Sequence, residues 1–311
     1  MNELKLQTPV HAGKSMLGLS PAEGCVLLGS CFADNIGKRM QELGFNVCVN
    51  PFGTLFNPVS VCNSATRLES GVLFTEKECI PMGAGAGLIC SFSHHTSFAR
   101  PTAEAFLANA NQSLSAASKA WKEASKVMIT LGTAWCFEHV ETGGIVSNCL
   151  KRDGKEFVRK CLSVQDVSLL LKNMLTRFPG KGFMFTVSPI RHLADGAHGN
   201  QLSKSTLLLA VEEACKAFPD RAEYFPAYEI VMDELRDYRF YAPDMVHPSE
   251  QAIDYLWGRF AEWAIPEASL QDLENRRRTF LRLKRHQSNS PASHFFLNPD
   301  RFSWCNPLPD N

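Results

Sequence analysis

Short apolar runs alternate with amphipathic segments along most of this 311-residue chain, and this alternation most restricts how it can fold. Four runs have the length and composition of buried strands: residues 25–28, 45–49, 127–131 and 183–187. The segments expected to be helical are residues 32–43, 59–68, 103–125, 164–176 and 203–217, followed by a fifth strand at 222–225 and a closing helix at 249–263. This order predicts an α/β fold with a mostly parallel sheet and helices on both faces.

Two stretches interrupt the alternation. Residues 71–100 contain a glycine-rich segment at 83–87 and are expected to form an insertion or a small hairpin. Residues 266–311 read as a C-terminal extension, packed on or trailing a main domain of residues 1–265. The basic run in this extension is interpreted as a solvated helix face; it contains Arg276, Arg277, Arg278, Lys284 and Arg285.

The composition argues against several classes of partner. Lys plus Arg and Asp plus Glu both number 32, so the overall charge does not favour nucleic acid. No apolar run reaches 18 residues, and we expect no membrane span. The 11 cysteines are scattered without a Cys-x-x-Cys motif, which suits a reducing compartment and predicts a cytoplasmic protein. The dispersed histidines have no zinc-ligand spacing, so no metal or cofactor is expected: His94, His95, His192 and His198.

The segment Gly-Ser-Cys-Phe-Ala at residues 29–33 lies where the first strand passes into the first helix. A hydroxyl at such a turn projects from the carboxyl edge of the sheet, close to the free N–H groups of the helix. On the residues alone, Ser30 is equally well explained as a nucleophile or as a helix N-cap. The next residue, Cys31, should turn about 100° away and behave as a small buried hydrophobe.

A second segment, Asp244 to His247, offers a carboxylate and an imidazole three residues apart in a proline-flanked loop. Each residue alone is readily explained as a turn or capping residue. Together they supply the two partners that a hydroxyl nucleophile needs, a base and a group that orients the base. We therefore predict His247 as the general base and Asp244 as its orienting partner.

The motif at 29–33, the segment Asn-Pro-Phe-Gly-Thr at 50–54 and the late Asp-x-x-His resemble the GSCFA family over roughly residues 20–265. This family resembles a branch of the SGNH, or GDSL-like, esterases and lipases. The resemblance implies a three-layer α/β/α sandwich of flavodoxin-like type. It also implies a catalytic triad of Ser30, His247 and Asp244.

The same resemblance suggests an oxyanion hole. Gly53 occupies the place of a glycine whose backbone N–H donates to the oxyanion in the resembled esterases. Their second donor is an asparagine after the third strand, but here residues 132–135 read Gly-Thr-Ala-Trp. Asn57 and Thr133 are the candidates to replace it, because both are expected at the carboxyl edge of the sheet. Asn57 is preferred for its two amide hydrogens.

Four further residues are candidate substrate-binding groups: Gly132, Trp135, His95 and Arg191. Arg191 follows the fourth strand and could receive an anionic part of a substrate, although a structural ion pair explains it equally well. Trp135 and Phe137 could wall the pocket, with core packing slightly preferred. His95 could line the pocket mouth, with an ordinary exposed histidine as the preferred alternative.

The candidate residues and the resemblance together predict a serine esterase. By analogy with neighbouring families, its expected substrates are O-acetyl or other short-chain esters of a small molecule or glycan. Two alternatives remain open. An acyltransferase could use the same triad with an alcohol acceptor. A binding or scaffold protein could keep the fold with weak chemistry, which the absent asparagine favours and the presence of all three triad residues opposes.

Overall fold

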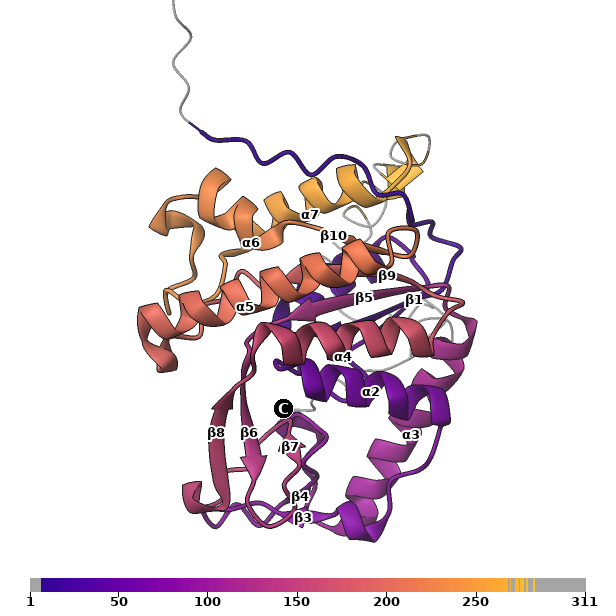
Figure 1. Cartoon of the computed structure of the whole chain (residues 1–311). Helices are drawn as coiled ribbons and strands as arrows, with labels where there is room; N and C mark the ends of the chain where they lie inside the picture. Colours follow the sequence, from indigo (N-terminus) through magenta and orange to yellow (C-terminus); the bar gives the residue numbers. More distant parts are fainter. Residues whose placement is uncertain are drawn as a thin grey trace, which may run out of the picture.

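The computed structural model describes residues 7–267 and, beyond them, residues 269, 272, 273, 275, 276, 278 and 282. Its central layer is a five-stranded, wholly parallel sheet in the order β10-β9-β5-β1-β2 (Figure 1). The strands are β1 (Cys25–Gly29), β2 (Val47–Val49), β5 (Lys126–Leu131), β9 (Gly182–Val187) and β10 (Ala222–Tyr224). The predicted parallel sheet is confirmed, including its fifth strand.

The sheet is covered by helices on both faces, which makes the fold a three-layer α/β/α sandwich. The helices are α1 (Cys31–Glu42), α2 (Pro58–Ser70), α3 (Ala103–Glu123), α4 (Val164–Arg177), α5 (Gly196–Ala217), α6 (Ala227–Glu229) and α7 (Glu250–Ala264). Shorter helical turns are η1 (Glu76–Glu78), η2 (Thr96–Phe98), η3 (Gly154–Glu156), η4 (Leu193–Asp195), η5 (Ile230–Glu234) and η6 (Tyr238–Phe240). The predicted helices are confirmed; the largest boundary difference is at α5, which begins seven residues earlier than the predicted residue 203.

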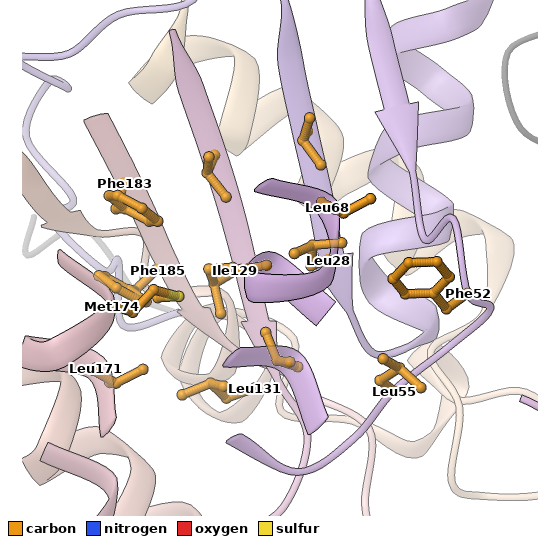
Figure 2. Close-up of a cluster of buried hydrophobic side chains, with 14 of the residues drawn as sticks. Leu28, Phe52, Leu55, Leu68, Ile129, Leu131, Leu171, Met174, Phe183 and Phe185 are labelled. Carbon is orange, nitrogen blue, oxygen red and sulfur yellow. The ribbon is translucent and has the colours of Figure 1, made fainter. Parts of the chain in front are cut away.

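The period-two alternation of the strands divides the core into two clusters. Leu28, Ile129 and Phe185 face one way and pack with residues of α2 to α5, as Figure 2 shows for Leu68, Leu171 and Met174. Leu27, Met128 and Met184 face the opposite way and pack against α1 and α7. Every residue of β1 and β9 is buried, as expected for strands covered on both faces.

Two small antiparallel sheets lie together below the central sheet in Figure 1. Strands β3 (Ile80–Pro81) and β4 (Ile89–Cys90) form the hairpin predicted within residues 71–100. Strands β6 (Trp135–His139), β7 (Ile145–Val146) and β8 (Phe157–Cys161) form a three-stranded sheet that the sequence analysis did not anticipate. This second sheet begins directly after β5 and therefore lies beside the carboxyl edge of the central sheet.

The strand order places a topological switch point between β1 and β5, because the chain leaves β1 toward β2 on one side and returns to β5 on the other. In open parallel sheets, ligands bind outside the carboxyl ends of the strands at such a point. None of the described helices is both long and apolar enough to span a membrane. Of the basic run near residue 280, Arg277, Lys284 and Arg285 lie outside the described residues, while Arg276 pairs with Asp272 at 2.7 Å.

Candidate active site at the carboxyl edge of the sheet

The turn between β1 and α1 is held rigidly. Gly29 has φ +136°, and a Cβ there would lie 2.0 Å from the carbonyl oxygen of Thr130, so only glycine fits. Its N–H donates to Asn50 Oδ1 at 2.8 Å, and the N–H of Ser30 donates to Thr130 O at 3.1 Å. Asn50, at φ +40°, also donates from Nδ2 to Asp34 Oδ1 at 2.7 Å. The turn is thereby tied to β5, to the end of β2 and to the first turn of α1.

Ser30 is the N-cap of α1. Its backbone is extended, with φ −73° and ψ 173°, and its Oγ accepts a hydrogen bond from Phe32 N at 3.3 Å. The residue is 1% exposed and does not line a described cavity. The capping role that the sequence allowed for Ser30 is therefore present in the structure.

Cys31 is the first residue of α1, is partly exposed and lines a large cavity. This placement corrects the expectation that Cys31 turns inward as a small hydrophobe. Burial raises the pKa of the thiol, and the neighbouring Asp34 carboxylate raises it further, while the amide N–H of Cys31 itself acts in the opposite direction. The thiol is thus held in its protonated form.

The loop from 244 to 247 brings the carboxylate of Asp244 and the imidazole of His247 into hydrogen-bonding contact. His247 Nδ1 lies 2.6 Å from Asp244 Oδ2, and Asp244 Oδ1 accepts the N–H groups of Val246 and His247, each at 2.9 Å. These backbone and side-chain hydrogen bonds lower the pKa of Asp244 to about 2, so its carboxylate stays ionised. Because Nδ1 is engaged by Asp244, Nε2 is the nitrogen left to meet a substrate.

The cavity that contains Cys31 has a volume of about 720 Å³ and lies at the carboxyl ends of β1, β5 and β9. His247 lines the same cavity, and so do Asn57, Thr133, Trp135 and Arg191. The loop that follows β9 is joined to the 244–247 loop by a hydrogen bond from Arg191 N to Val246 O at 3.4 Å. Among the described residues no hydrogen bond links His247 to Ser30 or Cys31.

The β6–β8 sheet supplies one wall of the cavity. The Arg159 guanidinium lies 5.1 Å from the Trp135 ring and 5.3 Å from the Phe137 ring, and it forms an ion pair with Asp195. Phe137 is 37% exposed, so it is a wall residue rather than the core residue that the sequence analysis slightly preferred. The three-stranded sheet that carries this wall, with Arg159 on its last strand, is the largest part of the site that sequence reasoning missed.

The predicted oxyanion donors lie in three different situations. Gly53 N donates to Asn50 O at 2.7 Å within a turn, and Gly53 is not among the cavity residues. Asn57 caps α2 by accepting from Ser60 N at 2.8 Å, and its Nδ2 makes only a long contact of 3.4 Å to Val146 O. Thr133 Oγ1 pairs with Ser203 Oγ at 3.0 Å. Asn57 is therefore the best placed of the three to donate into the cavity.

His95 and Gly132 do not line the cavity. The His95 side chain instead caps η2 and pairs with Ser97 Oγ at 3.0 Å. Gly132 lies just behind the wall, where its carbonyl accepts a hydrogen bond from Lys204 and a Cβ would meet Phe56 and His192. The expectation that His95 lies at the pocket mouth is therefore not met at this cavity, because the His95 side chain caps η2.

His192 is a cavity residue that the sequence analysis did not assign to the site. Its Nε2 is buried without a hydrogen-bond partner among the described residues, and its ring meets Phe56 edge to face at 5.7 Å. Burial, with the nearby charges of Lys204, His247 and Arg159, lowers its pKa to about 4. His192 is therefore neutral at physiological pH, and a neutral imidazole donates from one ring nitrogen and accepts at the other.

Lys204 braces the floor of the site. Although it is 0% exposed, its Nζ donates to Gly132 O at 2.6 Å and to Ser188 O at 2.7 Å, the carbonyls just after β5 and β9. Burial lowers its pKa to about 7. Lys204 thereby joins the ends of two strands whose connecting loops line the cavity. The apolar pattern of α5 gave no signal for this role.

A second cavity, of about 320 Å³, lies between α2 and the segment around Phe92. Serines and Arg67 line it, but Arg67 already pairs with Glu78. No base and nucleophile come together there. Among the described residues, no group of three or more His, Cys, Asp or Glu side chains is arranged to hold a metal ion.

A comparison with protein-family models matches residues 25–260 to the GSCFA family. The chain belongs to the GSCFA family. The matched region spans all five strands of the parallel sheet, from β1 to α7, and includes both the β1–α1 turn and the 244–247 loop. A search of curated proteins found no match.

Proposed function

We propose that this GSCFA protein catalyses acyl transfer from carboxylic esters to water. The observation that carries the proposal is the Asp244–His247 pair, with 2.6 Å between the bonded atoms, on the wall of a cavity of about 720 Å³. A carboxylate bonded to Nδ1 fixes the imidazole tautomer in which Nε2 can remove a proton. The same cavity reaches the β1–α1 turn through the thiol-bearing Cys31, and the buried hydroxyl of Ser30 lies one residue before it.

The electrostatics support base catalysis. Asp244 is ionised down to about pH 2, and its negative charge stabilises the imidazolium that forms when His247 takes a proton. The site has no direct hydrogen bond between His247 and the turn. Such bonds are often long in unliganded sites and tighten when the substrate binds, so a bound ester is expected to bring the groups together.

The lining of the cavity supports a small ester with both apolar and charged parts. Trp135, Phe137 and Ile190 provide apolar surface for an acyl chain or for the face of a sugar ring. Arg191 lines the cavity, and its side chain has no hydrogen bond or ion pair with any described residue. It is available to an anionic group of the substrate. We propose an O-acyl ester, such as an acetylated carbohydrate, as the substrate.

The test is hydrolysis of p-nitrophenyl acetate and butyrate by the whole chain and by His247→Ala. Removing the base should lower kcat/KM by about 10²- to 10⁴-fold. The matched control is His198→Ala, because His198 is exposed on α5 and does not line the cavity. Wild-type activity in His247→Ala, or no hydrolysis by the wild type of these esters or of acetylated sugars, would refute the proposal.

A further inference from the structure

The two residues that could supply the nucleophile differ sharply in their surroundings. Ser30 is 1% exposed, and its Oγ is used to cap the helix by accepting from Phe32 N at 3.3 Å. Cys31 is partly exposed and belongs to the cavity wall that also contains His247. Successive residues of a helix point about 100° apart, so only one of these neighbours can face the cavity.

Building on the proposed acyl transfer, we infer that Cys31 Sγ is the nucleophile and that Ser30 is the cap that orients it. The thiol shares its cavity with the Asp244–His247 pair, so its position is supported by more than its own exposure. The turn behind it is pinned by Gly29 and Asn50, which leaves the first turn of α1 little freedom to rotate. This assignment reverses the roles that the sequence predicted for the two side chains.

The helix terminus supplies an oxyanion donor beside the thiol. Ser30 N bonds to Thr130 O, whereas Cys31 N makes no hydrogen bond to another described residue. The Cys31 N–H lies close enough to stabilise the thiolate of its own side chain. A carbonyl carbon bonded to Sγ would therefore hold its oxygen near this N–H and the positive end of the α1 dipole. Asn57 and His192 are further polar residues that line the same cavity.

The chemistry balances with an ester and one water molecule. His247 Nε2 takes the thiol proton while Sγ bonds to the carbonyl carbon, giving a tetrahedral oxyanion. Collapse of the oxyanion breaks the ester C–O bond, and the departing alkoxide takes the proton from His247. Water, deprotonated by His247, then attacks the thioester. The S–C bond breaks, the acid departs and the proton returns to Sγ. Burial of Cys31 keeps its thiol protonated at rest, so the base is required.

The first experiment locates the acyl group in the unmodified protein. Wild-type protein is quenched with acid during p-nitrophenyl acetate turnover, and its peptides are mapped by tandem mass spectrometry. An acetyl group on Cys31 that neutral hydroxylamine removes supports the inference, because thioesters are far more labile to this reagent than oxygen esters. A hydroxylamine-resistant acetyl group on Ser30 overturns it.

The second experiment compares Cys31→Ala with Ser30→Ala. Cys31→Ala should lower kcat by at least about 10³-fold, whereas Ser30→Ala should keep kcat within about tenfold of wild type. Cys79→Ala is the control, because this thiol lies outside the cavity, between η1 and β3. Activity lost in Ser30→Ala and kept in Cys31→Ala would overturn the inference and leave the proposed hydrolase intact. Activity unaffected by His247→Ala would instead refute the proposed function itself.

Discussion

The two halves of the candidate site are built in opposite ways. The β1–α1 turn is buried, and its backbone is bonded to β5 and to Asn50 at the end of β2. The 244–247 loop is bonded mainly within itself, and the side chains of Asp244 and His247 are 50% and 47% exposed. A change in the turn should therefore affect both stability and catalysis. A change in the loop should affect catalysis alone.

The largest expected effect is that of Gly29→Ala. The new Cβ would lie 2.0 Å from Thr130 O, and alanine disfavours φ +136°, so β1 and β5 would have to separate. We expect the free energy of unfolding to fall by at least about 3 kcal/mol, measured by urea denaturation. Gly180→Ala is the control, because nothing lies within 4 Å of a Cβ there. Equal stability of the two variants would show that the turn is not rigid.

The loop is tested by Asp244→Asn. The amide can still accept the N–H groups of Val246 and His247, but it cannot hold the His247 tautomer. We expect kcat to fall by about 10²- to 10⁴-fold with an almost unchanged Tm. The neighbouring Asp237→Asn, whose carboxylate pairs with Arg239, should leave kcat unchanged. A Tm that falls as steeply as in Gly29→Ala would remove the contrast between the two regions.

The buried amine of Lys204 leads to a prediction about how the free energy of unfolding depends on pH. The folded-state pKa of Lys204 is about 7 and its ordinary value is 10.5, so between these limits the unfolded chain binds more protons. Below pH 7 the folded protein bears the full free-energy cost of burying the Lys204 ammonium group. This cost falls at higher pH as the amine loses its proton. Relative to Lys204→Met, the wild type should gain up to about 1.4 kcal/mol of unfolding free energy per pH unit between pH ~7 and ~9.

The cysteines and other groups that titrate in both proteins contribute equally to the two unfolding free energies. Their effect therefore cancels in the difference between wild type and Lys204→Met. Lys122→Met is the control, since this lysine is exposed at the end of α3. It should show no such trend against the wild type. A difference between wild type and Lys204→Met that stays constant over this pH range would contradict the buried, easily deprotonated amine.

The smallest effect is expected for Ser30→Ala. Losing an N-cap costs about 1 kcal/mol of stability. Ser163→Ala removes the equivalent cap of α4, far from the turn in sequence, and should cost a similar amount. Urea denaturation of both variants measures this comparison. A loss of unfolding free energy several times larger in Ser30→Ala than in Ser163→Ala would contradict this expectation. It would mean that the Ser30 hydroxyl stabilises the β1–α1 turn as well as the end of α1.

Local sequence pattern was sufficient to predict much of the fold and part of the candidate site. The apolar runs identified four of the parallel strands, the order of elements added the fifth, and the Asp-x-x-His spacing identified a pair that does bond. Both predictions depend only on residues that lie close together in the sequence. The Trp135–Cys161 region was missed because its strands are short, partly polar and exposed, so they lack the apolar run of a buried strand.

Local sequence pattern could not predict which side chain of the β1–α1 turn faces the cavity. Whether residue 30 or 31 faces the cavity depends on where the helix begins, and a difference of one residue rotates the side chains by about 100°. The roles of Lys204 and His192 depend on contacts between α5, the loop after β9 and the carboxyl ends of β5 and β9. No spacing in the sequence reports such contacts.

The central claim is that the rigid turn and the exposed loop act as one catalytic unit. A double-mutant cycle on kcat/KM with Cys31→Ala, His247→Ala and the double variant tests it most directly. If thiol and imidazole serve the same step, the double variant will be no less active than the weaker single variant, as in other nucleophile–base pairs. Losses that multiply independently would contradict the account, because the two residues would then contribute to hydrolysis separately.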